Sequence, residues 1–193
     1  MSKEKEKEIV FLDTETTGLN VFKEDVMELA IISLKNKGKK SYLFDKLLKP
    51  KVKCSPGAFN CHHITNEMVA NEKHLIDYYD ELKEILKDKL VVIYNSDYDK
   101  SLINSICERY GKEPLINDTY CLMEYYAVRN GDYNEYHQSY SWVKLTTAYY
   151  NEKENMQMPK CDEINIKAHR ALGDCLMSKY IYIACKKDLQ GSK

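Results

Sequence analysis

The sequence has no apolar stretch that approaches the length of a membrane-spanning helix. It also lacks a secretory signal, because its opening residues 1–8 alternate lysine and glutamate after Ser2. A strong net charge is missing too, since 29 basic and 30 acidic side chains leave a formal charge of -1. We therefore expect a cytoplasmic protein with a solvated N-terminal tail at residues 1–8 and no membrane partner. Any polyanionic ligand must be held by local basic patches or by metal ions.

Paired cysteines are absent as well. The seven cysteines are scattered, and no two of them form a C-x-x-C pair, which predicts reduced thiols in a protein without a secretory signal. One group combines residues that can bind zinc: Cys54, Cys61, His62 and His63. Its spacing matches no common zinc module, and adjacent histidines rarely bind the same ion. These two points argue against a zinc site. A structural zinc protein is kept as an alternative hypothesis, which predicts tightly held zinc and no catalysis.

The remaining composition is that of a soluble globular protein, with 193 residues, 44% apolar and 31% charged. Apolar runs predict strands at residues 9–15, 26–34, 42–48, 90–94 and 115–120. Helical spacing predicts helices at residues 77–89, 100–110, 121–128, 142–150 and 168–187. This order predicts one three-layer α/β domain at residues 9–188, with a mixed five-stranded sheet, its first three strands antiparallel, and helices on both faces.

Three connecting segments complete the prediction. Thr65 is placed to cap a short helix that starts at Asn66. Residues 129–140 are polar, rich in tyrosine and aperiodic, which predicts a loop, and residues 151–165 predict a connector that contains Pro159. The 129–140 loop is our candidate for a ligand-facing segment, because exposed aromatic rings can stack on flat ligands.

Two carboxylates stand at the end of the first strand. Asp13 and Glu15 are separated by one residue, so on a strand they project from the same face. Like charges this close resist ionisation unless a positive charge lies between them. A divalent cation such as Mg²⁺ or Mn²⁺ fits, because these ions prefer carboxylate oxygens. Gly18 follows and allows a tight turn or the close approach of a ligand.

Further polar residues are predicted to reach the same place. Asp99 follows the fourth strand, and functional crevices of open α/β sheets lie outside the carboxyl ends of strands. His169 and Asp174 lie five residues apart, a spacing that diverges by about 140° on a regular helix. The two side chains can share a site if His169 precedes the last helix.

These residues fall into three motifs, DTETTG, YNSDYD and HRALGD, whose order and spacing resemble the DEDDh (DnaQ-like) 3′–5′ exonucleases. That family includes polymerase proofreading subunits, ribonuclease T and oligoribonuclease. The resemblance covers residues 9–179 and extends to the H-H-I-T segment at 62–65, which is similar to the family's H-G-I-T, and to Asp118-Thr119. It implies a ribonuclease H-like fold.

The resemblance also implies roles for individual residues. Four carboxylates would hold two Mg²⁺ or Mn²⁺ ions, and His169 would be the general base; the carboxylates are Asp13, Glu15, Asp99 and Asp174. Two metal ions can activate a water molecule and stabilise the leaving oxygen in phosphoryl transfer. The substrate-binding residues implied by the resemblance, together with our own assignment of Arg170 to a phosphate, are Thr16, Gly18, Leu19, His62, Asn95 and Arg170.

The sequence departs from the family pattern at two places. The second motif commonly reads H-N-A-x-F-D, whereas here Asp97 adds an acid two residues before Asp99. Alignment on Asn95 and Tyr98 selects Asp99 as the ligand. His63 replaces the usual glycine of H-G-I-T, which leaves the conformation of that loop open. All five catalytic residues are present, which indicates an active enzyme.

The resulting hypothesis is metal-dependent release of 5′-mononucleotides from single-stranded 3′ ends, with DNA as the expected substrate. One alternative is an exoribonuclease of the ribonuclease T or oligoribonuclease type, because the motifs do not report contacts to the 2′-hydroxyl. Another is a nucleic-acid end-binding module that works beside a polymerase. The sequence leaves open the oligomeric state and whether a DNA polymerase subunit is a partner.

Overall fold

The computed structural model describes residues 7–35, 41–155 and 166–191. Most of the predicted tail, residues 36–40 and the part of the predicted connector at 156–165 lie outside these ranges. Within them, no helix combines the length and the apolar character that crossing a membrane requires. The six cysteines that lie in the described ranges are free thiols.

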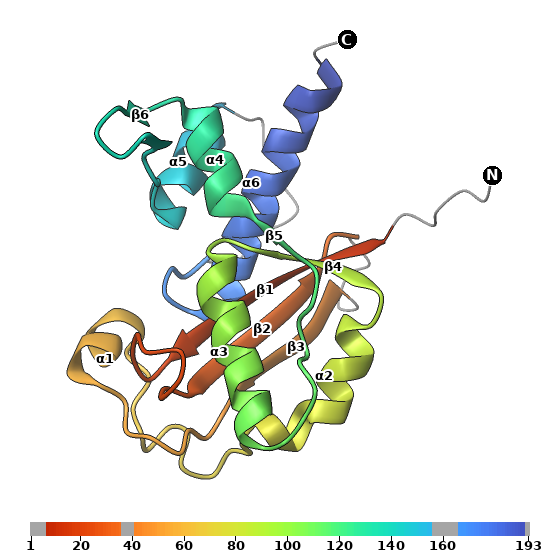
Figure 1. The fold of residues 1–193 in the computed structure, drawn as a ribbon, viewed down its shortest axis with the longest axis vertical. Coiled ribbons are helices and arrows are strands. Elements are labelled where there is room, and N and C mark those ends of the chain that lie inside the picture. The colour runs from red at the N-terminus through yellow and green to blue at the C-terminus, as the bar shows by residue number, and fades with distance from the viewer. Residues whose placement is uncertain (1–6, 36–40, 156–165, 192–193) are drawn as a thin grey trace, which may run out of the picture.

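Five strands form one mixed sheet in the order β3-β2-β1-β4-β5 (Figure 1). The strands are β1 (Glu8–Thr16), β2 (Val26–Ser33), β3 (Tyr42–Leu47), β4 (Lys89–Ile93) and β5 (Thr119–Cys121). Antiparallel pairing joins β1 to β2 and β2 to β3, while β4 runs parallel to both β1 and β5. The predicted sheet, with an antiparallel first half, is confirmed. Its central strand is β1, which carries the paired carboxylates.

Helices cover both faces of the sheet. Alternate residues of β1 point to opposite sides, and apolar side chains on both sides are buried beneath helices. Val10 and Leu12 belong to one core with α2 (Tyr79–Leu86) and α3 (Ser96–Arg109). Phe11 belongs to the other core, beneath three helices: α4 (Leu122–Asn130), α5 (Leu145–Asn155) and α6 (Ala171–Gly191). Figure 1 shows α3 in front of the strands and α6 passing behind them. The three-layer α/β architecture is therefore confirmed, and each fully buried side chain such as Phe11 stabilises it by roughly 1.5–3 kcal/mol.

Helix α1 (Pro56–His62) was not predicted. The Ser55 hydroxyl accepts a hydrogen bond from the backbone N–H of Ala58 at 3.2 Å, and Pro56 occupies the first turn, where its missing N–H costs nothing. The helix predicted from Asn66 is wrong, because residues 66–72 form turns. Thr65 does accept a hydrogen bond from the backbone N–H of Met68, but the chain does not continue into a helix.

Other helix boundaries also differ from the prediction. A 3₁₀ turn, η2 (Leu75–Tyr78), precedes a shortened α2. Helix α3 begins at Ser96, four residues earlier than predicted, so Asp99 lies in its first helical turn. Carboxylates are favourable there because they face the positive end of the helix dipole. Helix α5 continues to Asn155, so the first part of the predicted connector is helical.

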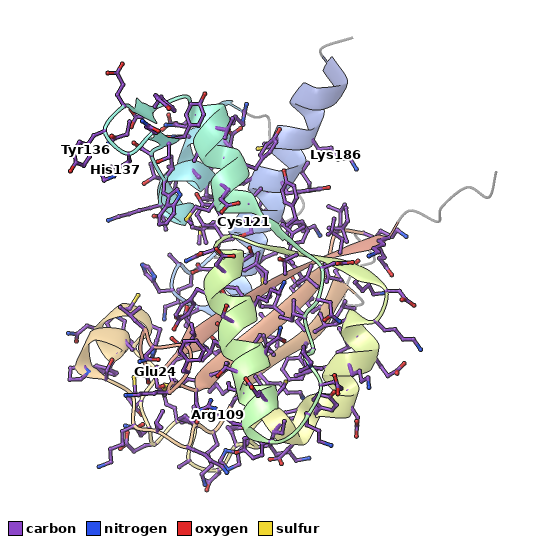
Figure 2. All side chains as sticks on the ribbon, viewed as in Figure 1. Glu24, Arg109, Cys121, Tyr136, His137 and Lys186 are labelled. Atoms are coloured by element: carbon purple, nitrogen blue, oxygen red, sulfur yellow. The ribbon has the colours of Figure 1, made fainter. Side chains whose placement is uncertain are left out.

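The predicted loop at 129–140 contains a short hairpin of β6 (Tyr133–Asn134) and β7 (Ser139–Tyr140). The rings of Tyr133 and Tyr140 pack edge to face with centroids 5.2 Å apart. Figure 2 shows Tyr136 and His137 at the outer end of this hairpin, and the Tyr136 side chain is 90% exposed. Whether the segment faces a ligand stays a prediction.

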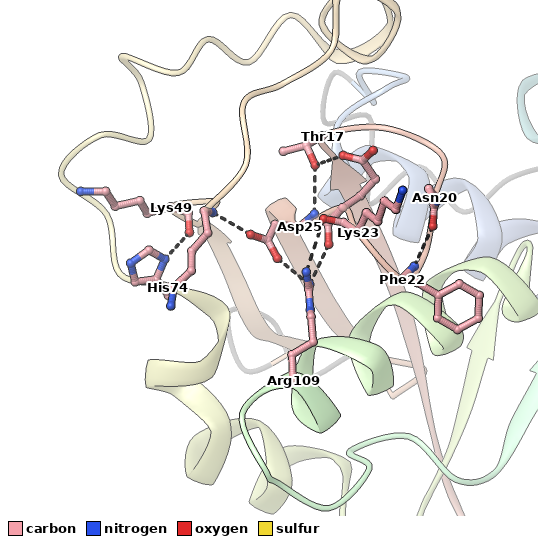
Figure 3. Close-up of polar contacts among 10 residues, drawn as sticks. Thr17, Asn20, Phe22, Lys23, Asp25, Lys49, His74 and Arg109 are labelled. Carbon is pink, nitrogen blue, oxygen red and sulfur yellow. Dashed lines mark hydrogen bonds and ion pairs between the residues drawn. The ribbon is translucent and has the colours of Figure 1, made fainter.

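A polar network fixes the loop between β1 and β2 (Figure 3). The Asp25 carboxylate accepts hydrogen bonds from the Arg109 guanidinium at 2.7 Å and from the backbone N–H of Lys51 at 2.6 Å. The backbone of Asp25 pairs with Thr17, whose hydroxyl donates to Glu24 at 2.6 Å. The network ties the loop to α3, so the segment that follows β1 has one defined path.

Candidate active site

Three carboxylates converge at the carboxyl end of β1. Asp13 and Glu15 project from the same face of that strand, as predicted for residues two apart, and Asp174 comes from the first turn of α6. One carboxylate oxygen from each of these residues lies within 4.8 Å of the other two. The three oxygens could hold a divalent cation of the Mg²⁺ or Mn²⁺ type, because the donor set is entirely carboxylate.

Asp99 lies outside that group of three but is attached to the same strand. Its carboxylate accepts a hydrogen bond at 2.6 Å from the hydroxyl of Thr14, the residue between Asp13 and Glu15. The Asp99 side chain is buried, with 6% of its surface exposed, whereas Asp97 is exposed. Asp99, and not Asp97, is thus buried against β1, where its charge adds to the effect of burial in raising the pKa of Asp13.

Burial of these carboxylates disfavours their charged forms and raises their pKa values. Burial raises the pKa of Glu15 to about 8, and the charges of neighbouring carboxylates act in the same direction. Burial likewise raises the pKa of Asp174 to about 7 and that of Asp99 to about 6, although the hydrogen bond from Thr14 opposes the shift at Asp99. The pKa of Asp13 is raised well above its ordinary value, first by burial and then by the surrounding carboxylates. A bound cation would reverse these shifts.

His169 lies in the bend before α6, which is the position that lets it share a site with Asp174. Its backbone adopts a left-handed conformation (φ 59°), and its N–H donates to the Asp174 carboxylate at 3.2 Å. The ring is exposed, and its Nδ1 lies 3.3 Å from the Cys61 sulfur on α1. The His169 backbone therefore contacts the carboxylate group, while its exposed ring contacts helix α1.

A pocket of about 680 Å³ opens beside Glu15, between the segment that follows β1 and helix α1. Thr16, Gly18 and Leu19 line one wall, and the Leu19 side chain is 89% exposed. A Cβ atom on Gly18 would lie 2.8 Å from the Glu24 carboxyl carbon, so glycine lets the segment pass close to Glu24. The pocket joins an exposed apolar side chain to the carboxylate group.

His62 is buried in the second wall of this pocket. Its Nδ1 accepts a hydrogen bond from the backbone N–H of Ile64 at 2.9 Å, so its Nε2–H can donate to the carbonyl oxygen of Thr16 at 3.1 Å. Burial lowers the pKa of His62, which favours this neutral form. His63 has φ 59° and ends α1, so it adopts the left-handed conformation that a glycine would favour.

Two predicted substrate-binding residues, Asn95 and Arg170, do not line the pocket beside Glu15. Asn95 is exposed immediately before α3. Arg170 instead directs its guanidinium to Glu28 on β2, with its Nε 2.9 Å and 3.1 Å from the two carboxylate oxygens. Sequence reasoning missed Glu28, although a charged residue inside the apolar run at 26–34 was a signal of a buried partner.

The alternative zinc site is not assembled in the described part of the chain. There, no group of three possible metal ligands includes Cys54, Cys61, His62 or His63. Cys54 lies 3.7 Å from His62, but the sulfur of Cys61 contacts His169 instead. The structure gives the zinc-protein hypothesis no support.

The family model for exonucleases of the RNase T type matches residues 10–182. The chain belongs to this DEDDh, DnaQ-like exonuclease family. It is 31% identical to the uncharacterized exonuclease CP81 of Escherichia phage 186 over 188 residues, which is 94% of this chain and 90% of that protein. It is also 30% identical over 132 residues to the PolC-type DNA polymerase III of Staphylococcus haemolyticus, of which the match covers only 9%. The predictions of the family and of an exonuclease are confirmed.

Solved structures agree on the fold. Exonuclease X in complex with 5′ overhanging duplex DNA has a TM-score of 0.64 at 21% identity, with 96% of this exonuclease and 94% of that chain covered. Exonuclease I has a TM-score of 0.69 at 18% identity, covering 94% of this chain and 41% of that one. The predicted ribonuclease H-like fold is thus confirmed.

The positions of Asp99 and Asp97 generate a mutational prediction. Asp99→Asn should lower the rate of nucleotide release by at least about 100-fold. Mutation of a residue that only supports a metal ligand lowers activity by roughly 10–100-fold, so loss of a ligand itself should lower it as much or more. Asp97 is exposed and lies two residues before Asp99. Asp97→Asn removes the same charge there and should change the rate by less than about 3-fold. Initial rates, with circular dichroism to confirm the fold, measure both. Equal losses in the two variants would contradict the placement of Asp99.

The raised pKa values predict that the metal-free protein becomes less stable as the pH rises. Unfolded carboxylates ionise near pH 4, whereas those in the folded site hold protons up to about pH 6 to 8. This contribution to the free energy of unfolding is therefore complete below about pH 4 and is lost as the pH rises from there through the folded pKa values, to about pH 8. Thermal midpoints in EDTA at pH 5 to 8 should fall less steeply in Asp13→Asn than in the wild type, while Asp97→Asn should follow the wild type. Identical pH profiles for all three proteins would contradict the prediction.

Proposed function

We propose that this exonuclease hydrolyses single-stranded nucleic acid from its 3′ end and releases 5′-mononucleotides, with DNA as the substrate. The observation that carries the proposal is the group of Asp13, Glu15 and Asp174 at the edge of a pocket, with the His169 backbone bonded to Asp174. The names of its relatives support DNA, because they include a DNA polymerase and exonucleases bound to DNA.

The carboxylates are proposed to hold two Mg²⁺ or Mn²⁺ ions. Asp13, Glu15 and Asp174 present the closest oxygens, and Asp99 faces the same strand through its hydrogen bond to Thr14. Four ionised carboxylates would offset the four positive charges of such a pair. When bound, the ions would supply charge neutralisation at the scissile phosphate and a more acidic attacking water.

His169 is proposed to accept a proton from the attacking water. If its Nδ1–H faces the Cys61 sulfur, Nε2 is the free acceptor nitrogen of the ring. Histidine suits this task because the free side chain titrates near neutral pH. The hydrogen bond between the His169 backbone and Asp174 keeps the base beside the carboxylates.

The pocket beside Glu15 is proposed to receive the terminal nucleotide. Leu19 offers an exposed apolar side chain against which a base can pack, while the turn at 16–18 brings backbone groups close to the 3′-hydroxyl. His62 contributes indirectly, because it binds the carbonyl oxygen of Thr16 and so fixes that turn. Asn95, exposed at the start of α3, is proposed to contact the substrate from the opposite side.

A DNA polymerase subunit is a proposed partner, supported by the similarity to a PolC-type polymerase. That similarity covers 68% of this chain and 9% of the polymerase, so the partner is a separate proposal from the activity.

Two oligonucleotides of one sequence, DNA and RNA, test the proposal when each is labelled separately at its 3′ and 5′ ends. With Mg²⁺ or Mn²⁺, the 3′ label should appear at once as a mononucleotide, while the 5′ label should form a ladder that shortens one nucleotide at a time. EDTA should stop both, and DNA should be degraded faster than RNA.

Other outcomes discriminate between the alternatives. Faster degradation of RNA would identify an exoribonuclease and contradict the choice of substrate. Early release of the 5′ label would contradict the polarity. Oligonucleotide binding without any release would support the end-binding module, and Asp97→Asn serves as the active control against an inactive Asp13→Asn.

A further inference from the structure

Next to Glu15 lies a partly buried ion pair between strand β2 and the start of α6. The Glu28 side chain is 4% exposed and accepts hydrogen bonds from the Nε and Nη2 of Arg170. The same carboxylate accepts the backbone N–H of Ala171, the first residue of α6, at 2.9 Å. Glu28 therefore fixes both the arginine side chain and the first turn of the helix, where a negative charge is favourable.

This ion pair is joined on both sides to proposed catalytic residues. Arg170 directly follows His169, and its carbonyl oxygen accepts the backbone N–H of Asp174 at 3.0 Å. On β2, Glu28 pairs directly across the sheet with Glu15 on β1. A shift of Arg170 relative to the sheet would consequently move His169 and Asp174 relative to Glu15.

Gly173 shows how little freedom this segment has. A Cβ atom at this position would lie 2.0 Å from the carbonyl oxygen of Lys167, so the chain before α6 passes directly over the first turn of the helix. His169, between these two residues, holds its left-handed backbone conformation. The bend is thus fixed by close packing on one side and by the Glu28–Arg170 pair on the other.

We propose that Glu28 and Arg170 form a positioning pair, which sets the place of His169 and Asp174 relative to β1, and that Arg170 does not bind a substrate phosphate. This inference rests on the proposed function for the roles of His169 and Asp174. It replaces the expectation, drawn from the sequence, of a phosphate contact by Arg170. The Nε and Nη2 of Arg170, which form one of the two nitrogen pairs able to bind an oxyanion bidentately, are already bound to Glu28, and Nη2 belongs to both pairs.

The two roles predict opposite kinetics. A phosphate ligand acts on substrate binding, so its loss raises KM and weakens the dependence of KM on salt. A positioning pair acts on the geometry of the reacting groups, so its loss lowers kcat with little change in KM. The pair also acts as a unit, so the loss in a double variant should be smaller than the product of the two single losses.

The test compares Glu28→Gln, Arg170→Met and the double variant with the wild type. The rate of nucleotide release from an oligonucleotide is measured at several salt concentrations. Each single variant should lower kcat by about 10–100-fold with KM within about 3-fold, and the double variant should be no slower than the slower single variant. A matched control is the Lys89–Glu8 ion pair between β4 and β1, at 2.7 Å. Glu8→Gln and Lys89→Met should leave kcat unchanged within about 3-fold.

A second measurement keeps the test independent of activity. Because Asp174 would move, Arg170→Met should weaken Mn²⁺ binding, measured by titration calorimetry, by about 10–100-fold, and Arg170→Lys should weaken it less. If the wild type releases no nucleotide, the proposed function is wrong. The Mn²⁺ affinities of the variants still test whether Glu28 and Arg170 position Asp174. Where Arg170→Met does not fold, Arg170→Lys and Glu28→Gln preserve more of the packing and give the same comparison.

The proposal is overturned by a raised KM with unchanged kcat in Arg170→Met together with a silent Glu28→Gln. Unchanged Mn²⁺ affinity in every folded variant would also overturn it.

Discussion

Repulsion among carboxylates that are partly removed from water is the constraint on which this site depends. At a separation of 4.8 Å, two unit charges repel by about 3 kcal/mol when the effective dielectric constant is about 20. Asp13, Glu15 and Asp174 all experience such repulsion, and Asp99 adds to it. The site is therefore costly without a cation or protons, and the rest of the fold must hold these groups together.

The fold does so from several directions. β1 is the central strand of the sheet and is packed on both faces, so Asp13 and Glu15 are attached to its most rigid part. α3 brings Asp99 to the hydroxyl of Thr14, and α6 brings Asp174 through its contact with β2. The four carboxylates come from three elements, β1, α3 and α6, so no single helix or loop could bring them together. His169 and the pocket beside Glu15 border the same group.

How much the sequence could predict depended on whether the signal was local. The β1–β3 meander was predictable because its apolar runs are separated by short polar turns. α1 was missed because no element was assigned to residues 54–61, although serine followed by proline is a start signal for helices. The polar residues after Tyr94 were assigned to a loop, yet Asp97 and Asp99 are acceptable in the first turn of α3. The contact between Arg170 and Glu28 was not predicted, because the two residues lie 142 positions apart in the sequence and only the folded chain brings them together.

Calorimetry of Mn²⁺ binding at pH 7, in two buffers with different enthalpies of ionisation, tests the electrostatic account most directly. The raised pKa values mean that the metal-free site holds protons at this pH, so binding should release about one or more protons per protein, and fewer at pH 9. Asp13→Asn should bind Mn²⁺ more weakly and release fewer protons, while Asp97→Asn should match the wild type. Binding with no proton release at pH 7, or no binding at all, would contradict the claim that carboxylate repulsion is relieved by a divalent cation.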